Sequence, residues 1–429
     1  MSIATECAKQ QACWIEKPLD QCATIQTGVS KGRKIDGEEL VSVPYLRVAN
    51  VQDGYLNLSE IKKVQIRPNE VSRYALQPGD VLLTEGGDFD KLGRGFVWNG
   101  ELPECIHQNH VFAVRVDQTQ LDPHFFAYQV QSPLGKQYFL SVAHRTTNLA
   151  CINTTKLKAF PVRIPPMSEQ KEIVHILSTV KRAIEVQERI GETTTELKQA
   201  LMQKLFSEGL WGEPQKETEI GMVPESWEVV SLSEVCQILS GGTPSKQNPE
   251  FWQGTIPWVS PKDMKRPRLK DAQDHISQEG LDNGSKLAPA GSVLVVVRGM
   301  ILAKTVPVAL AEVPMAINQD IKAIVPGAKL SSDFLLYALE AFRENLFKRV
   351  GRSGHGTCTL MGHEIAELMI PLPKISTQKE VIEVFSSVDA KLRASTQKQI
   401  TLTALFKSTL NGLMTPSIAS HSHSSNHGN

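Results

Sequence analysis

Two stretches of the sequence concentrate side chains that can bind phosphate groups. The first comprises Lys262, Lys265, Arg266, Arg268 and Lys270, and the second comprises Arg343, Lys348, Arg349 and Arg352. Lysine and arginine neutralise phosphates, but such runs are also typical of ordinary solvated surfaces. The whole chain carries 46 basic and 46 acidic residues, so it has no bulk attraction for nucleic acid. Any nucleic-acid surface must therefore be a local patch.

Motifs of the common enzyme classes are missing from the sequence. It contains no GxxxxGK[ST] loop of an ATP-driven motor, and no HExxH, GxSxG or metal-spaced Cys/His cluster. The string 248–251 (NPEF) has glutamate where an adenine methyltransferase needs a second proline. The string 88–91 (DFDK) is weak as a nuclease motif, because two-metal sites need further carboxylates that converge on the ions. The pattern favours a protein that reads nucleic acid over one that cuts or modifies it.

Cysteine usage and hydropathy indicate a cytoplasmic protein. The seven cysteines are scattered, odd in number and form no CxxC pair, which is typical of reduced thiols. No signal peptide or membrane-spanning apolar run is recognisable. The end of the chain, 417–429, is poor in apolar residues and is expected to be disordered. Its three histidines, at 421, 423 and 427, fit a polar tail better than a metal site.

One long segment is predicted to be helical, and the chain contains it twice. Residues 168–206 open on a serine, contain no proline and place Ile173, Leu177 and Val180 at the alternating spacing of a coiled-coil seam. A shift of 208 maps these residues onto Val381, Phe385 and Val388 in the second copy, 376–414, without an insertion. Polar residues interrupt the apolar spacing near the middle of each copy. Two helices packed antiparallel on each other explain this pattern best.

The duplication extends into the globular parts. Trp14 maps to Trp227, Gly28 to Gly241 and Pro44 to Pro257 at a shift of 213, and the shift falls to 208 at the helices. Short strands are predicted at 44–48, 80–83, 256–259 and 292–297, and helical segments near 123–138 and 332–348. Each half is therefore of the α+β (mixed α/β) class. Proline-bearing extended stretches, 160–166 and 369–373, precede the long helices.

This organisation predicts the domain boundaries. The expected parts are a first domain at 1–166, a helix at 167–207, a polar linker at 208–224, a second domain at 225–373, a helix at 374–415 and a tail at 416–429.

The residues resemble those of type I restriction-modification specificity (S) subunits. Residues 221–227 (GMVPESW) and 240–245 (SGGTPS) are similar to the opening of a target-recognition domain in that family. Residues 164–173 (IPPMSEQKEI) resemble the entry into its spacer helix, and 372–381 (LPKISTQKEV) repeat this string with Lys374 and Thr377 substituted. The first domain keeps Trp14 and Gly28 but lacks the Pro-Glu-x-Trp and Thr-Pro-Ser strings.

The resemblance implies a pseudo-two-fold, non-catalytic subunit. Two target-recognition domains each read one half of a bipartite site in double-stranded DNA, and two antiparallel helices hold them apart. Two methyltransferase subunits, which methylate adenine, and two ATP-dependent restriction subunits are the implied partners. S-adenosylmethionine, ATP and Mg²⁺ are then cofactors of those partners, and this chain needs none. The helical segments 168–206 and 376–414 have 39 residues each. At about 1.5 Å per residue such a helix spans roughly 58 Å, which permits one to two DNA turns between half-sites.

Base reading needs Arg, Lys, Asn, Gln or similar side chains on projecting loops. In the first domain the candidates are Arg47, Lys91, Arg94, Asn109, Arg145, Thr146 and Asn148. In the second domain they are Lys262, Arg266, Arg268, Arg298, Lys304, Arg349, Arg352 and His355. Two alternatives remain open at this point: a scaffold that pairs proteins without reading DNA, and a self-contained DNA-modifying enzyme with an unrecognised active site.

Overall fold

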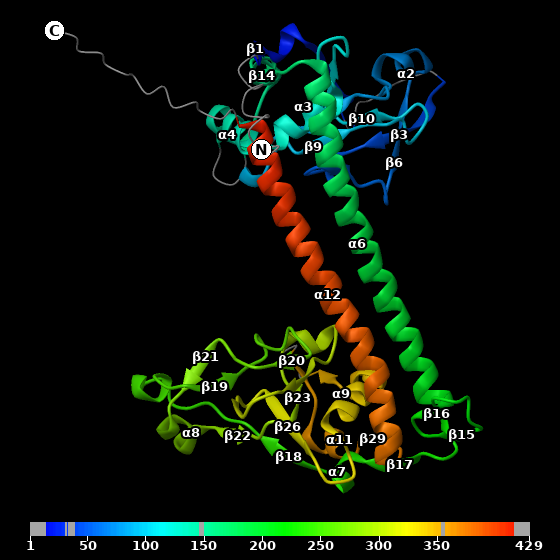
Figure 1. The fold of residues 1–429 in the computed structure, drawn as a ribbon, viewed down its shortest axis with the longest axis vertical. Helices are drawn as coiled ribbons and strands as arrows, with labels where there is room; N and C mark the ends of the chain where they lie inside the picture. The colour runs from blue at the N-terminus through cyan, green and yellow to red at the C-terminus, as the bar shows by residue number, and fades with distance from the viewer. Residues whose placement is uncertain (1–13, 31, 33–38, 146–149, 353–356, 416–429) are drawn as a thin grey trace, which may run out of the picture. The chain divides into compact units, whose positions relative to one another are not determined.

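The computed structural model describes residues 14–30, 32, 39–145, 150–352 and 357–415. The chain divides into two compact units, one comprising Met1–Gln187 with Lys398–Asn429 and the other Glu188–Gln397. Both predicted long helices are present, as α6 (Met167–Glu208) and α12 (Ile375–Met414), and each contributes residues to both units (Figure 1). The division between the units thus falls near the middle of each long helix.

The ends of α6 follow from local sequence. Pro165 and Pro166 precede the helix and keep the chain extended in β14 (Pro161–Ile164). Gly209 follows the last residue with a φ of +70° and donates its backbone N–H to Leu205 O at 3.0 Å, which is a common way for a helix to end. None of the helices among the described residues is long and apolar enough to cross a membrane.

The first unit contains two main sheets. An antiparallel sheet has the order β2 (Ala23–Thr27), β11 (Val111–Val116), β7 (Val81–Thr84) and β9 (Gly95–Val97). A second sheet has β3 (Val41–Leu46) between the parallel β10 (Ile106–His107) and the antiparallel β6 (Lys62–Ile66). The smaller elements are β1 (Ile15–Pro18), η2 (Leu19–Gln21), η3 (Val48–Asn50), β4 (Val51–Gln52), β5 (Tyr55–Leu56), α2 (Pro68–Tyr74), β8 (Gly86–Gly87), η4 (Phe89–Lys91), α3 (Pro123–Gln131), α4 (Pro133–Val142), β12 (His144–Arg145), β13 (Ala150–Cys151) and α5 (Thr154–Lys158).

The second unit repeats this plan with larger sheets. A five-stranded sheet has the order β18 (Cys236–Ser240), β26 (Ile321–Pro326), β23 (Val293–Val296), β24 (Val308–Ala311) and β20 (Arg268–Leu269). A four-stranded sheet has the order β21 (Asp274–Ile276), β19 (Ile256–Val259), β25 (Met315–Ile317) and β22 (Lys286–Ala288). The other elements are β17 (Glu228–Ser231), α7 (Leu232–Val235), η5 (Pro249–Trp252), α8 (Gln278–Gly284), η6 (Met300–Ala303), α9 (Ser332–Ala341), α10 (Arg343–Lys348), β27 (Gly351–Arg352), β28 (Cys358–Thr359), α11 (Gly362–Ala366) and β29 (Met369–Leu372).

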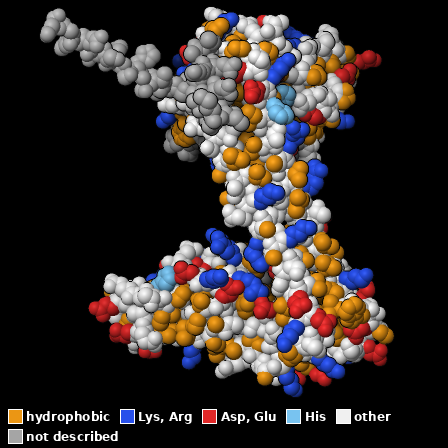
Figure 2. All heavy atoms as spheres, viewed as in Figure 1, with side chains coloured by type: hydrophobic (Ala, Val, Ile, Leu, Met, Phe, Trp, Pro, Cys, Tyr) orange, Lys and Arg blue, Asp and Glu red, His pale blue; other side chains and the backbone are white. Residues whose placement is uncertain are grey.

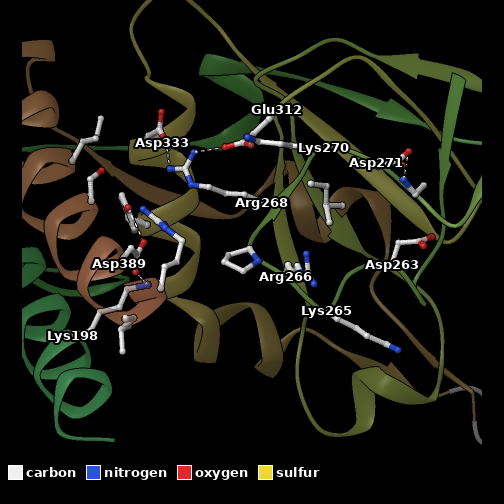
Figure 3. Close-up of a pocket in the computed structure, with 18 of the residues that line it drawn as sticks. Lys198, Asp263, Lys265, Arg266, Arg268, Lys270, Asp271, Glu312, Asp333 and Asp389 are labelled. Carbon is white, nitrogen blue, oxygen red and sulfur yellow. Dashed lines mark hydrogen bonds and ion pairs between the residues drawn. The ribbon is translucent and has the colours of Figure 1, made fainter. Parts of the chain in front are cut away.

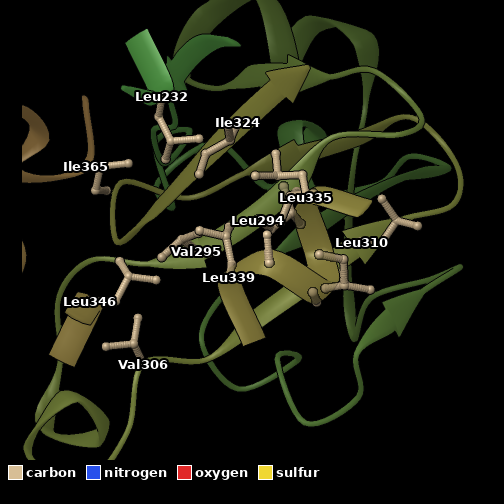
Figure 4. Close-up of a cluster of buried hydrophobic side chains, with 14 of the residues drawn as sticks. Leu232, Leu294, Val295, Val306, Leu310, Ile324, Leu335, Leu339, Leu346 and Ile365 are labelled. Carbon is tan, nitrogen blue, oxygen red and sulfur yellow. The ribbon is translucent and has the colours of Figure 1, made fainter. Parts of the chain in front are cut away.

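Each unit buries the start of one long helix. Ile173 and Leu177 lie in the core of the first unit, and their counterparts Val381 and Phe385 lie in the core of the second. In the second unit Leu294, Leu335 and other side chains from the central strand and α9 fill the core (Figure 4). Burying apolar surface is the main favourable term in folding, so each helix start is anchored to its own domain.

Two local features differ from the sequence-based expectation. The segment predicted as a polar linker contains an antiparallel hairpin, β15 (Gln215–Thr218) with β16 (Gly221–Pro224). The polar residues Thr194 and Ser395, which interrupt the apolar spacing, are 5% and 6% exposed, so the interruption lies in buried positions of the second unit. Within that unit Phe206 stacks on Phe385 and Gly191 lies against Ser395, which makes the two helix segments antiparallel.

Candidate nucleic-acid interface

A buried glutamine fixes the start of each long helix to its domain. Gln170 and Gln378 both have 0% exposure and are related by the shift of 208. The Oε1 atom of Gln170 accepts from the Asp122 backbone N at 2.8 Å, and its Nε2 donates to the carbonyls of Gln120 at 2.8 Å and Pro165 at 2.9 Å.

Gln378 repeats this pattern atom by atom. Its Oε1 accepts from the Ser331 backbone N at 2.8 Å, and its Nε2 donates to the carbonyls of Lys329 and Pro373, both at 2.9 Å. The Gln-Lys-Glu string repeats in the sequence at 170–172 and 378–380, but the sequence alone does not indicate that its glutamine is buried and bonded to the backbone. The two anchors fix the orientation of each domain on the helix that follows it, and hence the loops that carry the candidate DNA-reading residues.

Two of the first unit's candidate segments come together at a small sheet. Strand β13 pairs with β12 on one side and with β8 on the other, and β8 opens the glycine-rich loop that carries Lys91 and Arg94. Arg145, on β12, is exposed; its guanidinium lies 5.3 Å from the Phe89 ring centre and donates to Leu140 O at 3.2 Å. Lys91 forms an ion pair with Asp88. Thr146 and Asn148 lie outside the described residues.

The other two candidates of this unit follow neighbouring parallel strands. Leu46 of β3 is paired with His107 of β10, so Arg47 and Asn109 follow the carboxyl ends of two adjacent strands. Arg47 is partly buried and lies 3.5 Å from Glu60. The backbone N of Asn109 donates to Val29 O at 3.1 Å. His107 itself is buried, and this burial lowers the pKa of its imidazole.

The second unit has a matching patch around the hairpin β27–β28. Arg352 pairs with Cys358 across this hairpin, as Arg145 pairs with Ala150 in the first unit. The backbone of Arg298 forms an isolated antiparallel β-bridge with Thr359 of the same hairpin, and its side chain is 61% exposed and lies 4.0 Å from Asp320. Gly299, just before η6, donates its backbone N–H to Cys358 O at 3.1 Å, which holds η6 against the hairpin. Lys304, just after η6, is exposed. The structure thus brings three predicted residues, Arg298, Lys304 and Arg352, to one surface, while His355 lies outside the described residues.

The remaining candidates are largely engaged within the domain. Lys262 pairs with Asp274 at 2.7 Å. Arg268 pairs with Asp333 and lies 3.5 Å from Glu312. Arg349 donates to the backbone O of Glu364 at 3.1 Å, next to the start of α11, so its charge is used internally. Arg266 is exposed and has no side-chain partner among the described residues.

The described residues also contain no cluster of His, Cys, Asp or Glu that could hold a metal ion. The two domains carry exposed arginines, Arg145 and Arg352, at matching positions of β12 and β27, and each domain is fixed to its own helix. Such side chains suit contact with phosphates and base edges.

Comparison with known proteins agrees with this arrangement. The chain matches the family described as "Type I restriction modification DNA specificity domain" twice, over residues 14–195 and 224–404. It is 33% identical over 169 residues to the type I restriction enzyme EcoR124I/EcoR124II specificity subunit of Escherichia coli, which covers 39% of this chain and 42% of that protein. It is 23% identical over 398 residues to the putative type I restriction enzyme MjaX specificity subunit of Methanocaldococcus jannaschii, which covers 89% of this chain and 88% of that protein.

Solved structures show the same fold. A chain from a study of complex assembly in a type I restriction-modification system aligns with a TM-score of 0.59 at 18% identity, over 94% of this chain and 97% of that one. The S subunit of a type I system from M. genitalium aligns with a TM-score of 0.56 at 15% identity, over 93% and 96%. The predicted fold class, two duplicated mixed α/β domains with two long helices, is confirmed. The chain belongs to the family of type I restriction-modification specificity subunits, the non-catalytic component of these systems that recognises DNA.

Proposed function

We propose that each globular domain reads one half of a bipartite DNA site, and that α6 and α12 set the gap between the two halves. The observation that carries this proposal is the repeated glutamine anchor. Gln170 and Gln378 make the same three hydrogen bonds in the two units, so each reading surface has a fixed relation to one long helix. The first surface contains Lys91, Arg94 and Arg145, and the second contains Arg298, Lys304 and Arg352.

The partners and cofactors belong to the same proposal. A duplicated chain offers two equivalent surfaces, which suits two copies of one partner. We assign these surfaces to two methyltransferase subunits that modify adenine with S-adenosylmethionine, with two ATP- and Mg²⁺-dependent restriction subunits in the full assembly. This chain would direct methylation and restriction without cofactors of its own. Its location in the cytoplasm stays a prediction.

Selection of DNA from a random pool tests the reading function. The full chain, together with its methyltransferase, is incubated with random duplexes at moderate salt, and the bound duplexes are sequenced. We expect two short specified segments separated by an unspecified gap of fixed length. Failure to enrich a split motif would favour the alternative of a scaffold that reads no DNA.

A second experiment tests the spacing role of the helices. Seven residues are inserted into α6 and seven into α12, because a heptad keeps the apolar seam in register. The gap should lengthen while both half-sites stay the same. A change in the half-sites themselves would show that the helices take part in reading. Methyl transfer by the pure chain alone, measured with labelled methyl donor, would support the alternative of a self-contained enzyme.

A further inference from the structure

A hollow in the second unit has an excess of basic side chains. It lies between the loop 262–273 and α12, and seven basic and five acidic residues line it. Figure 3 shows Arg268 directed towards Asp333 and Glu312, and Lys198 directed towards Asp389. Figure 2 shows Lys and Arg side chains gathered on the same face, near β20 and α12.

Internal ion pairs account for four of the seven cations. Lys198 and Arg268 have the carboxylate partners named above, Lys262 pairs with Asp274 at 2.7 Å, and Lys270 lies 3.6 Å from Glu312. Lys265, Arg266 and Arg393 differ from these four. All three are exposed, and none has a side-chain hydrogen bond or ion pair to any described residue.

The first unit shows that the fold does not need these cations. Asp263 and Asn50 occupy equivalent places, because each accepts the backbone N–H of the residue three positions earlier, Ser260 or Arg47, at 2.9 Å. Their shift of 213 makes Gln52 and Asp53 the counterparts of Lys265 and Arg266, and the helix shift of 208 makes Glu185 the counterpart of Arg393. Three cations of the second unit thus replace an amide and two carboxylates.

We propose that Lys265, Arg266 and Arg393 bind the phosphate backbone of DNA, so that α12 contacts DNA in the second unit in addition to its spacing role. This inference rests on the proposed function. Cations that form no internal ion pair can bind a polyanion without breaking an interaction of the folded protein. Each phosphate contact also releases condensed counterions from the DNA, which favours binding. Two of the three are arginines, whose planar guanidinium can hold a phosphate through two parallel hydrogen bonds.

The position of the loop and the extent of the family match favour DNA over an acidic protein as the polyanion. The loop follows β19 at the position that corresponds to Arg47 in the first unit, one of the candidate base-reading residues. The matched DNA specificity region, 224–404, includes the loop residues and Arg393 alike. An acidic partner subunit is the competing occupant, and the experiment separates the two.

The test compares the salt dependence of DNA binding between two triple variants of the full chain. The first is Lys265→Ala/Arg266→Ala/Arg393→Ala. The control is Lys286→Ala/Lys379→Ala/Lys391→Ala, which removes the same charge from exposed residues of the second unit that do not line the hollow. Binding of a labelled random-sequence duplex is measured by fluorescence anisotropy at several KCl concentrations, and thermal melting checks that both variants fold.

The slope of log K against log[KCl] should become shallower by roughly 3 in the first variant, about one for each lost phosphate contact. Affinity near 0.1 M KCl should fall by more than about tenfold, and the control should change both quantities much less. Equal slopes for the two variants, or no binding by the unsubstituted chain at low salt, would overturn the inference. An unchanged slope with weakened binding to the methyltransferase would assign the hollow to a protein instead. If the unsubstituted chain still selects a split motif, such a failure leaves the proposed function intact.

Discussion

The same position of the repeated helix carries opposite charges in the two units. Asp389 of α12 and Lys181 of α6 are related by the shift of 208. In the second unit Asp389 accepts a hydrogen bond from the Tyr337 hydroxyl at 2.9 Å and pairs with Lys198 at 2.9 Å. Lys198 also lies 2.9 Å from Glu340, and its side chain is only 10% exposed.

The first unit fills the equivalent space with aromatic rings. Tyr128 corresponds to Tyr337, and Phe406 corresponds to Lys198; their ring centres are 6.1 Å apart in an edge-to-face arrangement. Lys181 donates to Gly54 O, and its Nζ lies 3.4 Å from the Phe96 ring centre. No carboxylate among the described residues of this unit forms an ion pair with Lys181.

The difference shows that duplication preserved the helix anchors but not the chemistry of the seam. The glutamine bonds are identical because they satisfy backbone groups, whose positions the fold dictates in both copies. The helix side chains at the equivalent positions interact mainly with side chains, Tyr337 and Glu340 in the second unit and Phe96 in the first, and these can change together. A buried ion network and an aromatic cluster are therefore alternative solutions of the same packing problem. Replacing a buried ion pair by well-packed apolar groups is often neutral, whereas removing one partner is costly.

The largest effect is expected from breaking the ion network on one side. Lys198→Met removes the lysine partner of Asp389 and leaves Glu340 with Arg343 at 3.8 Å, so it should lower the free energy of unfolding by about 3–5 kcal/mol. Chemical denaturation of the full chain measures this loss. The control Lys204→Met removes a lysine that is 68% exposed and 3.9 Å from Glu208, and should cost less than about 0.5 kcal/mol. A similar small cost for both variants would show that the network contributes nothing to stability.

The glutamine anchors should show equal effects in the two units. Gln170→Met and Gln378→Met each leave one backbone N–H and two carbonyls buried without their partner, so each should lower the free energy of unfolding by about 2–4 kcal/mol. The matched control is Gln203→Met, at an exposed position of α6. A large loss for one anchor and none for the other would contradict the view that the anchors are equivalent.

The sequence predicted the elements but not the pairs that hold them. Helical spacing and the constant shift identified α6, α12 and the duplication, and apolar runs identified β3, β7, β19 and β23. The hairpin β15–β16 was not predicted because its apolar and polar residues alternate only weakly, and because Gly212 and Gly221 are typical of a loop. Lys198 could not be distinguished from a surface lysine, since its burial depends on residues 142 and 191 positions away. The loops predicted to contact DNA include basic residues that form ion pairs within the domain, notably Arg268 with Asp333 and Arg349 with Glu364.

The pKa values of Lys181 and Lys198 shift in opposite directions, so the two units should respond differently to pH. Burial lowers the pKa of Lys181 from 10.5 to about 8, although the charge of Glu185 opposes this shift. Between pH 8 and 10.5 the unfolded chain binds a proton at Lys181 that the folded chain does not, so this residue makes stability rise with pH in that window. Burial also lowers the pKa of Lys198, but Glu340 and Asp389 outweigh burial and raise that pKa above 10.5. The charged form of Lys198 therefore stabilises the folded chain at all pH values below the usual lysine pKa, and this stabilisation is lost only as the pH rises above it.

The variant Lys181→Met isolates the first of these effects. At pH 7.5 it should be more stable than the unsubstituted chain by about 1–2 kcal/mol, because the cost of burying the charged amine disappears. At pH 10 the advantage should shrink towards zero. Paired denaturation curves at the two pH values measure the difference. An advantage that stays constant with pH would show that Lys181 keeps an ordinary pKa.

The smallest stability effects are expected at the two matching hairpins. Arg145→Ala removes a guanidinium that lies over Phe89 and should cost about 0.5–1 kcal/mol, whereas Arg352→Ala, without a ring contact among the described residues, should cost less than about 0.5 kcal/mol. Their effects on DNA selection should instead be separate and comparable: each variant should relax base preference in one half-site and leave the other unchanged. Sequencing of selected duplexes measures this. Relaxation of both half-sites by a single substitution would mean that the two surfaces do not read DNA independently.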